Sequence, residues 1–168
     1  IEYVVVELSS VQTKRLENFH PKVVVFTSIG EQYTTPHFQS MGEYIETKLS
    51  VVKALSPDDI LVINFDKLAN NAFFRNANCQ KYWYSRKSFV QLGVLNEIQG
   101  THFHDRRINS NINYHSQFVV TKMRIVGQEN RENLLAAVTV CKALNISDKS
   151  IQKMTEKFPG IPNRLEFV

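Results

Sequence analysis

The sequence predicts an α/β fold in which helices flank a mostly parallel sheet, with a small antiparallel section attached. Short β-branched runs recur in the first part of the chain, and a segment with helical spacing separates two of them. Alternation of strands and helices is typical of a parallel sheet with helices packed on it. The chain has 168 residues, which is the size of one domain, so we expect a single domain over 1–168.

Three apolar runs have the length and composition of buried parallel strands, at 3–8, 22–27 and 59–64. The first run, in "VVVELSSVQ", ends on the carboxylate of Glu7. We expect 3–8 and 22–27 to be neighbouring parallel strands, and we take this pairing as a test of the family resemblance described below.

Three segments are predicted to be helices. Residues 38–55 space their apolar side chains as one helix face does, and "SPDD" follows them. Residues 128–145 carry a second apolar stripe. A third helix is expected over 147–158, with Ser147 or Asp148 as its N-cap and "PGIP" ending it.

Residues 80–124 contain shorter and more polar strand-like pieces divided by Gly, Asn and Ser, which predicts an antiparallel meander. His102 and His104 would share one face of such a strand. A metal pair is one interpretation, but no third ligand is placed by spacing, so an exposed polar strand is favoured. The last residues, "NRLEFV", are predicted to begin a final strand.

Composition excludes several classes of function. The net charge of +4 comes from scattered basic residues, which favours a solvated surface or a nucleotide ligand over nucleic acid. No apolar run approaches the roughly 20 residues that span a bilayer. Cys79 and Cys141 lie far apart and indicate neither a disulfide framework nor a zinc site, so a reducing cytoplasm is expected. No phosphate loop, dinucleotide fingerprint or nucleophile elbow occurs in the sequence.

The order and spacing of several sequence blocks indicate a resemblance to a known family. The chain resembles the central, ATP-binding domain of the Mur ligases over nearly its whole length, through six blocks in the family's order: "VVVELSSVQ", "VVVFTSIGEQY", "YIETKLSVV", "VINFD", "GQENRENLLAAVTVCKALNIS" and "FPGIPNRLEFV". The resemblance implies a phosphate-loop-type fold that lacks its first strand and loop in this chain. The "ELSS" and "GIPNRLE" blocks favour the branch that adds D-glutamate to UDP-N-acetylmuramoyl-L-alanine, in peptidoglycan synthesis and thus cell-wall growth, cell shape and division.

The resemblance also implies a catalytic metal site. Glu7 would hold Mg²⁺ near the ATP phosphates, and Lys48, carbamoylated by carbon dioxide, would offer a second anionic ligand. Gln32 stands where the family has a metal-binding His and could offer a carbonyl oxygen. From the residues alone, a satisfied acid at a strand end is the favoured interpretation of Glu7, and the resemblance reverses that preference. Lys48 could likewise be an ordinary helical lysine.

The nucleotide contacts implied by the resemblance lie near the end of the chain. Asn130 and Asn133 match the pair that hydrogen-bonds adenine, a base that shows a donor beside an acceptor. They are three apart and so share a helix face, although they could also be a helix start alone. Arg164 matches the arginine that reaches the nucleotide phosphates.

The sequence departs from the family where Gln32, Glu129 and Asn163 replace histidines, and His37 aligns with a histidine that is not a ligand. These changes keep two rivals open. One is another Mur or folylpolyglutamate-type ligase, and the other is a non-catalytic Mur-like domain that binds a nucleotide or a protein partner. The leading hypothesis remains the central fragment of a cytoplasmic, monomeric ligase that uses ATP and Mg²⁺, with two small-molecule substrates and no nucleic acid or membrane span.

Overall fold

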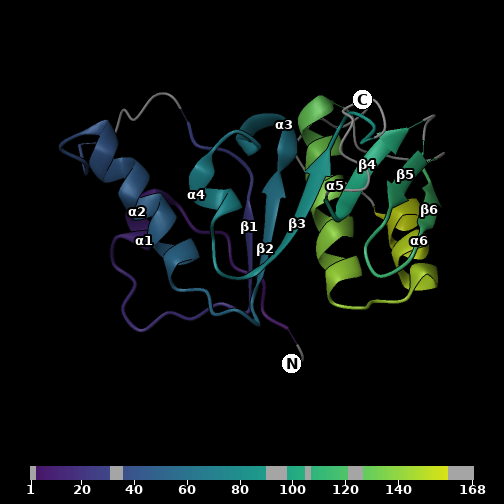
Figure 1. The fold of residues 1–168 in the computed structure, drawn as a ribbon, viewed down its shortest axis with the longest axis horizontal. Helices are drawn as coiled ribbons and strands as arrows, with labels where there is room; N and C mark the ends of the chain where they lie inside the picture. The colour runs from purple at the N-terminus through teal and green to yellow at the C-terminus, as the bar shows by residue number, and fades with distance from the viewer. Residues whose placement is uncertain (1–2, 31–35, 90–97, 105–106, 121–126, 159–168) are drawn as a thin grey trace.

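The computed structural model describes residues 3–30, 36–89, 98–104, 107–120 and 127–158. These residues form one mixed sheet with the strand order β1-β2-β3-β4-β5-β6 (Figure 1). Its strands are β1 (Val23–Phe26), β2 (Ile60–Asn64), β3 (Gln80–Ser85), β4 (Gly100–His104), β5 (Arg107–Ser110) and β6 (Ser116–Val119). The core strands expected at 22–27 and 59–64 are therefore confirmed.

The sheet changes direction at β4. Strands β1 to β4 are parallel neighbours, whereas β4, β5 and β6 form an antiparallel meander. The antiparallel section expected over 80–124 is thus confirmed only from β4 onward, and the placement of β3 in it was wrong. Tyr82, Trp83 and Tyr84 are all buried in β3, as in an interior parallel strand, but aromatic rather than β-branched side chains fill it.

The described helices are α1 (Ser10–Thr13), α2 (Met41–Lys53), α3 (Phe65–Leu68), α4 (Ala72–Arg75), α5 (Gln128–Ala143) and α6 (Asp148–Lys157). The three long helices match the segments expected at 38–55, 128–145 and 147–158. Ser40 and Ser147 cap α2 and α6, each accepting a backbone N–H three residues on. None of the described helices is long and apolar enough to cross a membrane.

Two apolar clusters cover the two faces of the sheet. Side chains alternate along β2, so that Ile60 and Val62 pack with α5 and α6, whereas Leu61 and Ile63 pack with α2, α3 and α4. Figure 1 shows α1 beside α2 at one end of the molecule and α6 beside β6 at the other. The architecture is therefore helix, sheet and helix in three layers.

The expected strand at 3–8 is wrong. Residues 3–9 have no strand or helix assignment, and Val5 is 96% exposed. Strand propensity depends on packing against neighbours, and Val4, Val5 and Val6 are all more than half exposed here. The expected pairing of 3–8 with β1 is therefore absent.

The favoured interpretation of His102, an exposed position on a polar strand, is wrong. Its side chain is buried in β4, with its ring 4.6 Å from that of Phe89 between centroids. Burial, with a smaller contribution from His104, lowers the pKa of His102 to about 4. No group of three or more His, Cys, Asp or Glu side chains that could hold a metal occurs in the described ranges.

We expect His102 to make the chain less stable in mild acid. The unfolded state takes up a proton near pH 6.5, whereas the folded state resists protonation down to about pH 4. Stability should therefore fall by about 2–3 kcal/mol as pH drops through this window. Urea unfolding at several pH values would show this slope, and His102→Asn should flatten it while the exposed His115→Asn should not. An equal slope in all three proteins would contradict the assignment.

Candidate functional site

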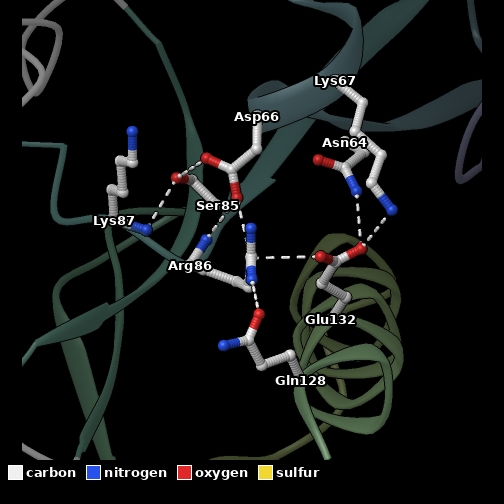
Figure 2. Close-up of polar contacts among 8 residues, drawn as sticks. All are labelled: Asn64, Asp66, Lys67, Ser85, Arg86, Lys87, Gln128 and Glu132. Carbon is white, nitrogen blue, oxygen red and sulfur yellow. Dashed lines mark hydrogen bonds and ion pairs between the residues drawn. The ribbon is translucent and has the colours of Figure 1, made fainter.

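Polar side chains gather where the parallel strands β2 and β3 end. Asn64 is the last residue of β2, Asp66 follows it in α3, and Ser85 is the last residue of β3. The carboxyl ends of parallel strands meet at one edge of the sheet, which is where α/β proteins bind ligands. This edge and the start of α5 are drawn in Figure 2.

Lys48 lies beside a hollow of about 190 Å³ between β1, α2 and the N-terminal segment. Its ammonium group is 5.1 Å from the centre of the Tyr44 ring. Leu8 and Ser10 also line the hollow, and Glu7, which comes just before Leu8, is exposed. The structure therefore brings Lys48 and the segment after Glu7 to one hollow, although residues 3–8 are not a strand.

The groups around this hollow suit a hard cation only in part. Mg²⁺ prefers oxygen ligands, and the hydroxyls of Ser10, Thr27 and Ser28 belong to residues that line the hollow. Glu7 does not line the hollow, although its neighbours Val6 and Leu8 do, and Gln32 lies outside the described residues. A carbamate on Lys48 would supply an anionic group that the residues lining the hollow otherwise lack. Glu46, on the same helix as Lys48, pairs with Lys53 at 2.5 Å.

The two candidate adenine ligands lie in the first turns of α5. Asn133 is exposed and Asn130 is half-buried. Their separation of three residues places both amides on one side of the helix, as expected. The candidate phosphate ligand Arg164 and the replaced histidine position Asn163 lie outside the described residues, whereas Glu129 is exposed on the first turn of α5.

Glu132, between the two asparagines, was not among the predicted site residues. Its side chain is only 10% exposed. Oε2 accepts hydrogen bonds from Asn64 at 3.2 Å and Lys67 at 2.7 Å, and Oε1 lies 3.1 Å from Nε of Arg86 (Figure 2). This carboxylate joins α5 to the ends of both β2 and β3.

Arg86 extends the same network to Asp66 and to the first residue of α5. Its backbone N–H donates to Asp66 at 2.9 Å, and its guanidinium donates to Gln128 at 2.6 Å. Asp66 also accepts the Ser85 hydroxyl at 2.6 Å. We call Asn64, Asp66, Lys67, Ser85, Arg86, Gln128 and Glu132 the strand-end network. Burial raises the pKa of the neighbouring Tyr84 hydroxyl.

One sequence signal could have revealed the network. Glu132 falls on the same helix face as Leu135, Ala136 and Thr139, all of which are buried. A carboxylate on the buried face of an amphipathic helix requires a partner. The partners come from segments distant in the sequence, so their identity needed the structure.

The chain matches the family described as Mur ligase middle domain over residues 1–141, and it belongs to that family. Among curated relatives, the UDP-N-acetylmuramoylalanine--D-glutamate ligase of Alkaliphilus metalliredigens is 29% identical over 99% of this chain and 35% of its own length. That of Oenococcus oeni is 31% identical over 96% of this chain and 34% of its own length. The chain thus spans about a third of these relatives.

The fold is similar to that of solved Mur ligases. A crystal structure of MurF from Acinetobacter baumannii superposes with a TM-score of 0.62 at 18% identity, covering 89% of this chain and 32% of that one. The family match includes residues 3–8, although they form no strand here. The pairing of 3–8 with β1 was therefore too strict a test of the family.

Proposed function

We propose that the whole protein to which this chain belongs is an ATP-dependent ligase that adds D-glutamate to UDP-N-acetylmuramoyl-L-alanine. The observation that carries this proposal is the similarity, near 30% identity over almost the entire chain, to relatives that bear this name. The fold and the polar edge of its parallel strands support a nucleotide-dependent enzyme. The product would serve peptidoglycan synthesis in the cytoplasm, and we expect a monomer.

The proposed reaction has two steps. The substrate carboxylate attacks the terminal phosphorus of ATP, giving an acyl phosphate and ADP. The amine of D-glutamate then attacks the acyl carbon, an amide bond forms, and inorganic phosphate and a proton leave. Both steps develop negative charge on oxygens that fixed positive groups can stabilise.

Each site residue has a proposed role in that scheme. Glu7, carbamoylated Lys48 and Gln32 would hold Mg²⁺, which when bound neutralises charge on the phosphates and the carboxylate. Asn130 and Asn133 would bind adenine. Arg164 would hold the nucleotide phosphates through its fork of donors.

Phosphate release by the full-length protein tests the function. With ATP, Mg²⁺ and UDP-N-acetylmuramoyl-L-alanine, we expect D-glutamate to stimulate release, and L-glutamate, L-lysine and D-alanyl-D-alanine not to. Stimulation by a different amino acid would favour another Mur or folylpolyglutamate-type ligase. Nucleotide binding without turnover on any of them would favour the non-catalytic domain.

We expect Asn133→Ala in the full-length protein to weaken ATP binding by about 1–2 kcal/mol, because one hydrogen bond to a buried polar group is lost. Calorimetric titration of a non-hydrolysable ATP analogue measures this. Asn78→Ala is the matched control, because Asn78 is also exposed but precedes β3, at the opposite end of that strand. Unchanged affinity for Asn133→Ala would remove the amide from the site.

A further inference from the structure

We propose that Glu132 and Arg86 are positioning residues for nucleotide binding, which fix the direction in which α5 presents Asn130 and Asn133. This inference rests on the proposed function, because it assumes that the two amides contact adenine. It goes further in assigning a role to charged residues that touch no nucleotide themselves.

The start of α5 lacks a cap of its own. Its N-cap residue is Gly127, which has a φ of 100° and offers no side-chain hydrogen bond. Helices that begin on Ser, Thr, Asp or Asn satisfy and fix their first turn through that side chain. In the described part of the chain, side-chain contacts with Asn64 of β2, Lys67 of α3 and Arg86, which directly follows β3, hold the first turns of α5 instead.

Glu132 fixes the rotation of α5 about its own axis. Its two oxygens are held from three residues, Asn64, Lys67 and Arg86. Each helical residue turns the chain by about 100°, so holding Glu132 against the strand ends sets the direction of the next side chain, Asn133. Both carboxylate oxygens of Glu132 already contact Asn64, Lys67 or Arg86. Glu132 therefore positions the two asparagine amides and does not itself bind the nucleotide.

Arg86 is itself rigidly placed. Its backbone N–H is bound to Asp66, and its guanidinium lies between Asp66 and Glu132, at 3.6 Å and 3.1 Å. The same guanidinium reaches Gln128, one turn before Glu132 on α5 (Figure 2). Two successive turns of the helix are thus tied to the carboxyl end of β3 by one side chain.

Lys87 provides a matched control. It is adjacent to Arg86 and exposed, and Figure 2 shows its ammonium group directed away from Glu132. Its part in the strand-end contacts is a backbone N–H that donates to Ser85, which substitution to alanine retains. Lys87→Ala therefore removes a cation from this edge without removing a contact to α5.

The test is a double-mutant cycle in ATP affinity in the full-length protein. Glu132→Gln keeps the size of the side chain and an oxygen that can accept hydrogen bonds, so that the variant can fold. We expect Glu132→Gln and Arg86→Ala each to raise the ATP Kd about tenfold, the scale of losing one or two hydrogen bonds to a ligand. The KM for D-glutamate should not change, Arg86→Lys should recover part of the affinity, and Lys87→Ala should bind as the wild type does.

The decisive comparison adds Asn133→Ala to each background. If Glu132 acts through Asn133, Asn133→Ala should have little further effect once Glu132→Gln is present. An equal loss of ATP affinity in both backgrounds would overturn the inference, and so would a lowered Tm with unchanged Kd. A wild-type protein that does not bind ATP would instead refute the proposed function.

Discussion

Replacing Lys48 by alanine in the full-length protein should remove most of its ligase activity, by about a hundredfold or more. This is the scale seen when one group that stabilises developing charge is lost. Lys48 lines the hollow beside β1 that also contains Leu8 and Ser10, next to Glu7. A lysine carbamate there would place an anion among hydroxyl groups, where Mg²⁺ finds oxygen ligands.

Lys53→Ala is the matched control for this experiment. Lys53 lies on the same helix and pairs with Glu46 at the surface, so turnover should stay near that of the wild type. Short-chain carboxylates added to the Lys48→Ala enzyme should restore part of its activity by standing in for the carbamate. Near-normal turnover of Lys48→Ala would reject the carbamate, and Lys48 would then be a cation packed over Tyr44.

Replacing Gly100 by alanine should lower the free energy of unfolding by about 3 kcal/mol or more. Losses of this size occur when a substitution causes a severe steric conflict with the backbone or in the core. A Cβ at Gly100 would press against the carbonyl oxygen of Trp83 and lie 2.7 Å from its carbonyl carbon. These two residues are register partners between β3 and β4. The conflict is with backbone, so a change of rotamer cannot relieve it.

Urea unfolding followed by the fluorescence of the buried Trp83 measures this loss. Gly42→Ala is the control, because among the described residues a Cβ there meets the hydroxyl of the N-cap Ser40 at 3.6 Å, an ordinary contact at the start of α2. It should be neutral or slightly stabilising, since alanine favours helix over glycine. Equal stability of the two variants would show that β3 and β4 do not approach as described.

The local sequence pattern predicted two parallel strands and two helices correctly. β1 and β2 are short β-branched runs, and α5 and α6 carry periodic apolar faces. The pattern failed at 3–8, where the valines have strand propensity but are largely exposed. It also misplaced β3, because its aromatic side chains gave no β-branched signal of burial on two faces.

The candidate site was predictable only as separate residues. The family resemblance named Glu7, Lys48, Asn130 and Asn133, and the structure places Lys48 beside the segment that follows Glu7 and puts both asparagines on the first turns of α5. Nothing in local spacing could link Glu132 to Arg86 and Lys67, because the sheet brings these distant segments together. The strand-end network therefore became visible only with the fold.

A crystal structure of the full-length protein with ADP and Mg²⁺ tests the nucleotide site most directly. We predict that adenine hydrogen-bonds to Asn130 and Asn133 at the start of α5, and that a carbamate on Lys48 shares the metal site with Glu7. In a cluster whose metals are roughly 4 Å apart, the Lys48 nitrogen and the Glu7 carboxylate should lie within about 8 Å. Adenine bound away from α5, or an unmodified Lys48 farther than that from Glu7, would contradict the account.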